Sequence, residues 1–150
     1  MKYFEDFRVG DVERFGCYRM TKDEVVEFAT RFDPQPFHID EAAGAAHPFF
    51  KKLAASGWHT AAATMRMMVD HNEELGVAGL GSPGLEQINW PVPTYPGDVL
   101  SVQSEVLEVR QSRSRPEMGF VKSLTTTLNQ DGRAVMNFTA NVMIAARPKS

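Results

Sequence analysis

The sequence predicts an α+β fold in which an antiparallel β-sheet wraps around one long central helix. Two observations carry this prediction. The first is a mostly apolar segment at residues 58–72 that is rich in the strong helix formers alanine and methionine. The second is a series of strand-forming segments in the second half of the chain. Helices followed by a run of strands are typical of the α+β class, where helices cover one face of an antiparallel sheet.

Length, composition and charge fit one soluble domain spanning residues 1–150. Of its 150 residues, 43% are hydrophobic and 23% are charged, which is ordinary for a protein with a single core. The formal net charge of -3 gives no basic field for nucleic acid, and no segment approaches the ~20 apolar residues of a membrane helix. An acidic N-terminal segment and a single cysteine, which cannot form an intrachain disulfide, favour a cytoplasmic protein.

After a short extended start, the first expected elements are a strand and a helix. Residues 12–20 follow a Val-Gly-Asp turn and have the mixed apolar and polar content of an edge strand. Thr21 is expected to cap the helix, because Glu24 stands three residues later and completes a capping box. The apolar residues that share one face of this helix are Val25, Phe28, Ala29 and Phe32. Pro34 and Pro36 end it, since proline disfavours helical geometry at the preceding residue.

A short helix at residues 40–46 precedes the long helix at residues 58–72. The long helix has apolar residues on most faces, so we expect it to be buried. A stretch rich in glycine and proline at residues 76–83 then separates the helical half from the strand-rich half without being long enough for a domain linker.

The second half contains expected strands at residues 85–90, 99–109, 119–128 and 134–145. Apolar and polar residues alternate in the last of them, which is the period of a sheet with one buried face. The sequence Asn-Gln-Asp-Gly before it supplies turn chemistry, so the last two strands are expected to form an antiparallel hairpin. A sheet of this size can wrap one long apolar helix, the arrangement known as the hotdog fold.

One loop has a composition typical of acid–base catalysis. Asp33 and His38 stand five positions apart in a segment stiffened by two prolines, a compact way to hold a general base beside a proton carrier. Taken singly, an Asp before Pro is a common turn and a loop histidine often only binds a carbonyl. The second candidate is Ser56-Gly57, where a backbone N–H at a helix start either stabilises negative charge or belongs to a simple cap and turn.

The loop resembles the hydration motif of the MaoC-like, R-specific enoyl-CoA hydratase and acyl dehydratase family. The usual form of that motif is Asp, any residue, Asn, Pro, an aliphatic residue and His. Asp33, Pro36 and His38 match it in type and spacing. Gln35 stands where Asn is usual, and Phe37 where a smaller aliphatic residue is usual. The similarity extends over nearly the whole chain.

The resemblance implies the same hotdog fold and an activity in fatty acid metabolism: reversible addition of water to a trans-2-enoyl-CoA, giving the (R)-3-hydroxyacyl-CoA. It implies that Asp33 and His38 activate the water and transfer its proton, and that the N–H of Gly57 binds the thioester oxygen. Coenzyme A enters only as part of the acyl-CoA substrate, and neither a separate cofactor nor a metal is expected. It also implies a homodimer, or a dimer of dimers, joined through sheet edges.

Five further residues are expected to contact the substrate. Ser56, Trp58 and His59 lie at the start of the long helix, although for His59 a role as a hydrogen-bonded core residue is favoured over a place in the pocket lining. Arg113 and Arg115 belong to the main concentration of positive charge, which is either a contact for the phosphates of coenzyme A or a solvated hairpin end.

Two other functions stay open. Hotdog folds also host thioesterases, because a carboxylate can activate water for either reaction, but the Asp-x-x-Pro-x-His spacing favours hydration. A non-catalytic acyl-CoA binding or partner subunit is the other, since the extra methylene of Gln35 alters whatever hydrogen bond positions the loop. Acyl chain length is expected to depend on residues 47–52 and 76–83. The chain has no dinucleotide-binding glycine motif, serine-hydrolase elbow or zinc-binding His-Glu-x-x-His.

Overall fold

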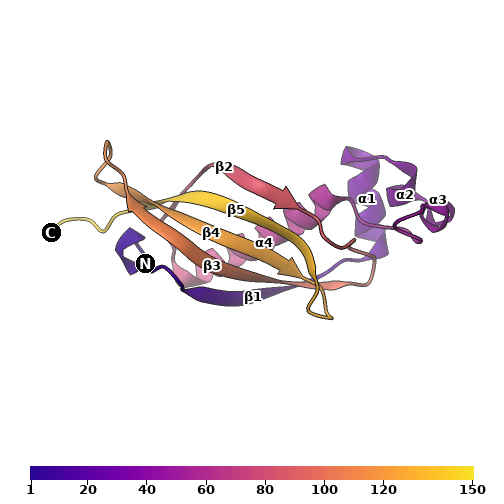
Figure 1. The fold of residues 1–150 in the computed structure, drawn as a ribbon, viewed down its shortest axis with the longest axis horizontal. Helices are drawn as coiled ribbons and strands as arrows, with labels where there is room; N and C mark the ends of the chain where they lie inside the picture. The colour runs from indigo at the N-terminus through magenta and orange to yellow at the C-terminus, as the bar shows by residue number, and fades with distance from the viewer.

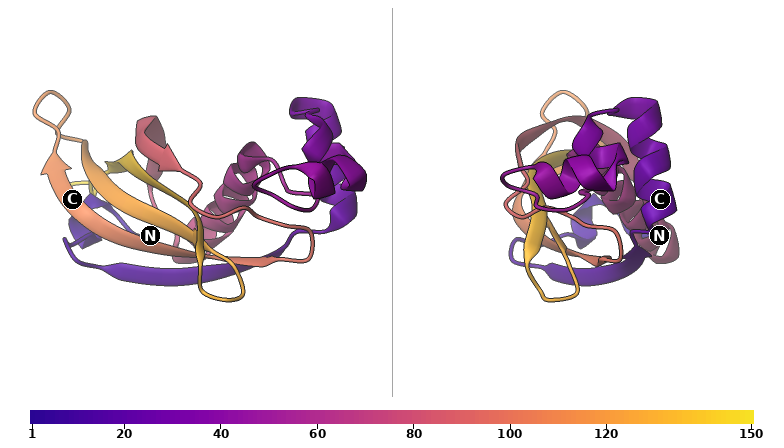
Figure 2. Two further views of the ribbon diagram at one scale, coloured as in Figure 1. Left: turned by 45° about the vertical axis from the view of Figure 1, so that its right-hand side comes forward. Right: turned by 90° about the vertical axis from the view of Figure 1, so that its right-hand side faces the viewer.

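Five antiparallel strands form one sheet in the order β1-β3-β4-β5-β2. The strands are β1 (Val12–Arg19), β2 (Gly79–Asn89), β3 (Val99–Gln111), β4 (Met118–Leu128) and β5 (Ala134–Ala145). In this computed structural model, which describes all 150 residues, the sheet curves around the helix α4 (Gly57–Leu75), as Figures 1 and 2 show. The predicted α+β class and the sheet wrapped around a long helix are confirmed.

Three shorter helices stand together at the end of the sheet where α4 begins (Figure 1). They are α1 (Lys22–Phe32), α2 (Pro36–Ile39) and α3 (Glu41–Ala46). Thr21 caps α1 by accepting a hydrogen bond from the N–H of Glu24, as predicted, and Asp40 caps α3 in the same way. The Glu24 carboxylate does not complete the capping box, because it binds side chains on other elements instead.

The central core lies between α4, α1 and the sheet. It joins apolar residues from α1, from α4 and the residues just before it, and from the end of β1, β3 and β5: Met20, Val25, Ala55, Ala63, Met67, Leu100, Val102 and Val135. Each fully buried valine, leucine or methionine stabilises the fold by roughly 1.5–3 kcal/mol relative to an exposed one. This core holds α1 and the start of α4 against the sheet, and so positions the site that these helices carry.

The long helix is buried on one face only, which corrects the expectation that most of its faces are buried. Trp58, Met65 and Val69 recur at helical spacing and are all exposed. Leu85 and Trp90, on and just after the edge strand β2, are exposed beside this side of the sheet. The chain thus leaves an apolar helix face and a strand edge without a partner of their own.

Several element boundaries differ from the sequence predictions. Residues 4–6 form a 3-10 turn rather than an extended start. His38 lies in the short helix α2 rather than in an extended loop, because the fixed φ of Pro36 suits the first position of a helix. The glycine- and proline-rich stretch is mostly strand, since β2 begins at Gly79. No helix is long and apolar enough to span a membrane.

Candidate active site

The end of α1 delivers Asp33 to the site. Asp33 is the C-cap of α1, and its N–H donates to the carbonyl of Ala29 at 2.8 Å. Pro34 follows and cannot continue the helix hydrogen bonding, so the chain turns there. The N–H of Gln35 donates back to the carbonyl of Asp33 at 2.8 Å, which closes a tight turn around the proline.

His38 is buried, and a backbone carbonyl holds one of its two ring nitrogens. Nδ1 lies 2.7 Å from the carbonyl oxygen of Ala54, and because a carbonyl only accepts, Nδ1 carries a hydrogen. That leaves Nε2 facing Asp33 Oδ2 at 3.4 Å, too long for a strong direct hydrogen bond. When the imidazole is neutral, Nε2 and the carboxylate both present acceptor atoms to the same space, a geometry that suits one water molecule donating to both.

Two hydrogen bonds stabilise the ionised form of Asp33. The hydroxyl of Ser56 donates to Oδ2 at 2.7 Å, and the side-chain amide of Gln35 donates to Oδ1 at 2.7 Å. Burial by itself would raise the pKa of Asp33, but the hydrogen bonds from Ser56 and Gln35, together with the neighbouring His38, hold that pKa below its usual value. Asp33 is therefore a carboxylate at neutral pH, as a general base must be.

The first turn of α4 offers a backbone donor. Ser56 caps the helix by accepting from the N–H of Trp58 at 3.3 Å, and the N–H of Gly57 donates to no protein group. A β-carbon on Gly57 would lie only 2.7 Å from the indole ring of Trp90, whose Nε1 donates to the Gly57 carbonyl at 2.9 Å. Glycine is therefore required here for close packing, and its free N–H points out of the positive end of the helix dipole.

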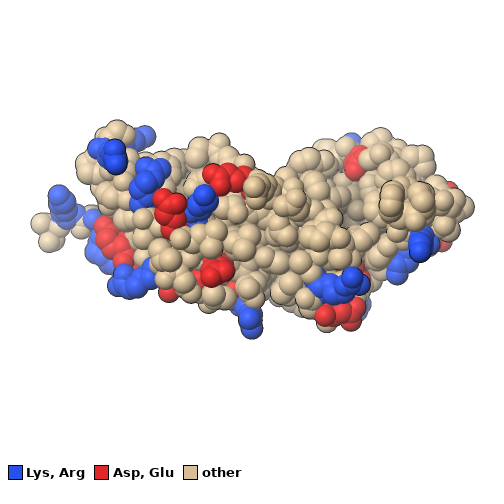
Figure 3. Space-filling model, in the orientation of Figure 1, with Lys and Arg blue, Asp and Glu red and all other residues tan.

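Asp33, His38 and Gly57 line one pocket of about 360 Å³. Much of the wall is aromatic or apolar, contributed by Phe37, Phe50, Trp58, Trp90, Val92 and Pro93. Figure 3 shows the surface hollowed between the end of β2 and the group formed by α1–α3, with few charged atoms around the hollow. A carboxylate, an imidazole and a backbone donor in an apolar pocket can activate water next to a polarised carbonyl group.

The structure separates Ser56 and His59 from the other expected substrate contacts. Ser56 is fully buried and acts on Asp33 rather than on the pocket itself. His59 is 2% exposed, stacks on Phe28 with ring centroids 4.7 Å apart, and places Nε2 3.1 Å from the Glu24 carboxylate. His59 is therefore a core residue, which corrects its expected place among the substrate contacts.

Glu24 joins His59 to Tyr18 beneath the site. The hydroxyl of Tyr18 donates to the same Glu24 oxygen that His59 approaches. Burial first, and the Glu24 carboxylate next, raise the pKa of Tyr18 to about 12, so that the phenol keeps its proton. This group links β1 and the first turn of α1 to the first turn of α4, and so ties the helix that carries Asp33 at its other end to the helix that begins at Gly57.

Arg113 and Arg115 lie far from the pocket within this chain. They occupy the turn between β3 and β4, at the opposite end of the molecule from α1–α3 (Figures 1 and 2). Arg115 pairs with Glu117 at 2.9 Å, and both side chains are exposed. The solvated hairpin end is thus the interpretation that the single chain supports, and a contact with a substrate in its own pocket is excluded by position.

Sequence reasoning connected Trp58 and residues 47–52 with the substrate, but it missed Trp90, Thr94 and the way His47 supports Phe50. Phe50 lines the pocket and stacks on His47, whose Nδ1 accepts from the N–H groups of Phe49 and Phe50 at 3.2 Å each. Trp90 and Thr94 reach the pocket from the connection after β2. The only local signal was the proline-rich composition of that connection. It indicates a rigid, non-helical segment, but it does not indicate that the segment contacts the pocket.

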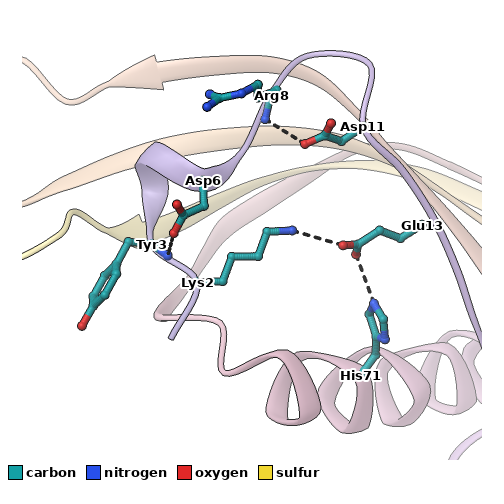
Figure 4. A network of polar contacts seen from close by, with 7 residues as sticks. All are labelled: Lys2, Tyr3, Asp6, Arg8, Asp11, Glu13 and His71. Atoms are coloured by element: carbon teal, nitrogen blue, oxygen red, sulfur yellow. Dashed lines mark hydrogen bonds and ion pairs between the residues drawn. The ribbon is translucent and has the colours of Figure 1, made fainter.

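A second hollow of about 80 Å³ lies between the sheet and the far half of α4. Its walls are mainly apolar, and Thr125 on its floor has a buried hydroxyl without a protein partner. At its edge Glu13 accepts from Lys2 and from His71 at 3.1 Å each (Figure 4). Burial would raise the pKa of Glu13, but these two partners hold it below its usual value, as in a satisfied structural ion cluster.

No three His, Cys, Asp or Glu side chains in the structure converge on a metal site.

A family model described as "MaoC like domain" matches residues 10–128. An uncharacterised protein of Bacillus subtilis, YdeM, is 29% identical over 140 residues, covering 93% of this chain and 96% of that protein. A 3-hydroxybutyryl-CoA dehydratase of Methylorubrum extorquens is 29% identical over 136 residues, covering 89% and 82% of the two chains.

Two solved structures share the fold. A MaoC-like dehydratase from Rhodospirillum rubrum superposes with a TM-score of 0.91 at 43% identity, over 99% of this chain and 100% of that chain. An (R)-hydratase from A. caviae superposes with a TM-score of 0.68 at 22% identity, over 96% and 99% of the two chains. At the lower identity the likeness is one of fold alone.

Proposed function

Because the chain belongs to the family of MaoC-like domains, we propose that it is a hydratase or dehydratase that reversibly adds water to a trans-2-enoyl-CoA and gives the (R)-3-hydroxyacyl-CoA. One observation carries the proposal. Asp33, His38 and the free N–H of Gly57 line the same pocket, although 24 residues of sequence separate the first from the last. These are the three groups that hydration of an unsaturated thioester requires.

In the proposed mechanism one water molecule donates to Asp33 and to Nε2 of His38. One of these two groups takes a proton from the water as its oxygen bonds to the β carbon, and the electron pair of the double bond moves toward the thioester. The N–H of Gly57 binds the thioester oxygen, where negative charge builds up. A proton then returns from the Asp33–His38 pair to the α carbon, so that one water is added in all.

The geometry supports distinct roles for the two side chains. The hydrogen bond from Nδ1 of His38 to the Ala54 carbonyl fixes the imidazole so that Nε2 faces the pocket. Ser56 and Gln35 hold Asp33 ionised. An oxyanion donor such as the Gly57 N–H typically lowers the barrier by ~3 kcal/mol.

Gln35, which stands where the family motif usually has Asn, makes a hydrogen bond that supports a catalytic protein over a binding subunit. Gln35 keeps a hydrogen bond from its amide to Oδ1 of Asp33 at 2.7 Å, so the longer side chain still orients the carboxylate. A chain that had lost turnover would have no need to keep the base, the imidazole and the donor on one pocket.

We further propose that two copies join along β2 into a homodimer. The strand is at the sheet edge, and unpaired edges favour pairing with another strand. Trp58, Met65 and Val69 on α4 and Leu85 on β2 are exposed apolar side chains that such a dimer would cover. A twofold arrangement would bury this surface on both copies at once.

The test follows the loss of the conjugated enoyl-thioester absorbance with crotonyl-CoA and longer trans-2-enoyl-CoAs. We expect Asp33→Asn and His38→Ala to stay folded and to lower kcat by orders of magnitude, because each removes a proton-transfer group. Asp23→Asn, an exposed carboxylate on the same helix α1, is the matched control and should keep wild-type rates.

Resolving the product on a chiral column decides the stereochemistry, and the (R) alcohol is expected. Release of free thiol without hydration would instead identify a thioesterase. Binding of acyl-CoA with neither reaction would identify a binding or partner subunit, and unchanged hydration in Asp33→Asn would remove Asp33 from the mechanism.

A further inference from the structure

A coenzyme A or carrier-protein thioester places a phosphate at the far end of its pantetheine arm, and a cation near the pocket is needed to bind it. Arg113 and Arg115 sit at the other end of the sheet and cannot serve a pocket of their own chain. The cations that follow the pocket wall in sequence are therefore the candidates for a phosphate contact.

Lys51 and Lys52 follow directly after Phe50, which lines the pocket and whose ring centroid is 5.8 Å from that of His38. Both lysines are exposed, and neither forms an ion pair with a carboxylate. Lys22, by contrast, is neutralised by Glu41 at 2.8 Å. Two adjacent ammonium groups thus remain unpaired in the two residues that follow the pocket-lining Phe50, in a chain whose net charge is -3.

The backbone that presents these lysines is fixed in an uncommon conformation. Lys51 has a φ of 61°, in the left-handed region that non-glycine residues rarely occupy. The turn is held by its own hydrogen bonds, with the N–H of Lys51 donating to the carbonyl of His47 at 3.1 Å. Conformations of this kind persist where the surroundings over-determine them, and they are enriched at ligand-binding sites.

Tyr95 connects the second lysine to the pocket wall. The ammonium of Lys52 lies 4.1 Å from the centre of the Tyr95 ring, a cation–π contact that leaves the charge unneutralised. The hydroxyl of Tyr95 donates to the carbonyl of Phe50 at 2.6 Å. One side chain therefore holds both Phe50 and the Lys52 head group in place.

From this arrangement we propose that Lys51 and Lys52 bind the phosphate of the 4′-phosphopantetheine arm that carries the acyl group. The assignment rests on the proposed function, because it presumes that a thioester occupies the pocket. Lysine suits the task, since its ammonium is a compact point charge that binds phosphate without demanding one fixed geometry. The same phosphate is present in coenzyme A and in an acyl carrier protein.

The test uses one acyl group on three carriers: crotonyl-pantetheine, which has no phosphate, crotonyl-4′-phosphopantetheine and crotonyl-CoA. In Lys51→Gln/Lys52→Gln, KM is expected to rise about three- to tenfold for the two phosphate-bearing thioesters, the range for two exposed charge contacts. Its kcat, and its KM for crotonyl-pantetheine, should stay at wild-type values. Lys149→Gln removes an exposed cation near the C-terminus and is the control.

Four results would overturn the assignment. An equal change in KM for all three thioesters would reveal a structural effect of the loop, and no change would exclude the lysines. A rise for crotonyl-CoA alone would place them on the nucleotide phosphates instead. An Arg113→Gln/Arg115→Gln variant that raises KM where the lysine variant does not would return the contact to the hairpin, on a partner copy.

Failure of the proposed function gives a different pattern, because the wild-type protein would then hydrate none of the three thioesters, including crotonyl-pantetheine. The natural source of the phosphate is decided by comparing kcat/KM of the wild type for crotonyl-CoA and for a crotonyl carrier protein. Because both carriers contain the 4′-phosphate, the lysine variant should show a higher KM for both of them.

Discussion

Replacing Ser56 by alanine removes the hydrogen bond that most directly keeps Asp33 ionised. The hydroxyl of Ser56 lies 2.7 Å from Asp33 Oδ2 and is fully buried, so the alanine variant leaves that oxygen without an equivalent donor. A hydrogen bond to a charged group is worth about 1.5–3 kcal/mol. Since about 1.4 kcal/mol corresponds to a factor of ten, we expect kcat/KM at neutral pH to fall by roughly 10- to 100-fold if the whole of that orientation is lost.

The same substitution predicts a shift with pH whose sign follows from the pKa of Asp33. That pKa is lowered in the folded protein, against the effect of burial, by Ser56, Gln35 and His38. Its ionisation therefore contributes stability above the unfolded pKa, and this contribution is lost as the pH falls through the folded pKa. Without Ser56 the folded pKa moves up, so the acid limb of the rate profile and the acid unfolding transition should both move to higher pH.

The assay is a rate profile of crotonyl-CoA hydration across the acid range, with urea unfolding measured at neutral and at acid pH. Gln35→Ala is the matched comparison, because Gln35 also donates to Asp33 at 2.7 Å but is exposed. Water can replace its amide, so the acid limb of the rate profile should move less than in Ser56→Ala. Ser56 also caps α4, which adds about 1 kcal/mol of pH-independent destabilisation. An unmoved acid limb in Ser56→Ala, or one equal to that of Gln35→Ala, would refute this account.

Four further variants test other features. Thr125→Val removes a buried hydroxyl without a partner and should keep or raise the free energy of unfolding. Thr127→Val, on the same strand, breaks a hydrogen bond and should lower the free energy of unfolding by about 1 kcal/mol. Urea titrations that rank the two variants the other way would contradict this account of the two hydroxyl groups. Gly57→Ala keeps the backbone N–H but drives a β-carbon into Trp90, which should displace that donor and lower kcat at least about tenfold in the hydration assay; a wild-type kcat would show that the close packing at Gly57 is not required. Leu85→Lys puts a charge on β2 and should give a monomer in sedimentation; a persistent dimer would place the interface elsewhere.

The fold followed from local patterns, because those patterns and the final packing agree. The alternation in residues 134–145 became β5 with the same bounds, and its apolar members Met136, Phe138, Ala140 and Ile144 are buried as the period requires. Thr21 caps α1 because a helix start needs an acceptor for its free N–H groups wherever the helix lies. Asp33 and His38 were found for a similar reason, since two prolines limit how far apart five residues can place them.

The parts that sequence reasoning missed depend on distances across the fold. Glu24 fits a capping box locally, but Tyr18 and His59 approach it from other elements and take its carboxylate. By charge alone, a phosphate contact suited Arg113 and Arg115. However, β3 is 13 residues long, and at about 3.3 Å per residue it places the hairpin that carries these arginines roughly 40 Å from the other end of the strand. No pattern in the sequence reports which end of a strand faces a pocket.

The Gln35 position illustrates what the motif requires chemically. With a proline on each side, the backbone at Gln35 is held in an extended conformation, φ -73° and ψ 139°, so little but the length of its side chain is free to vary. The amide still reaches Asp33 Oδ1, and the same carboxylate receives Ser56 on its other oxygen. Donors on both oxygens fix the plane of the carboxylate, and that plane sets where the water bound by Asp33 and His38 can lie. The requirement at this position is therefore an amide donor that reaches Asp33, which asparagine and glutamine can each supply when the backbone places them accordingly.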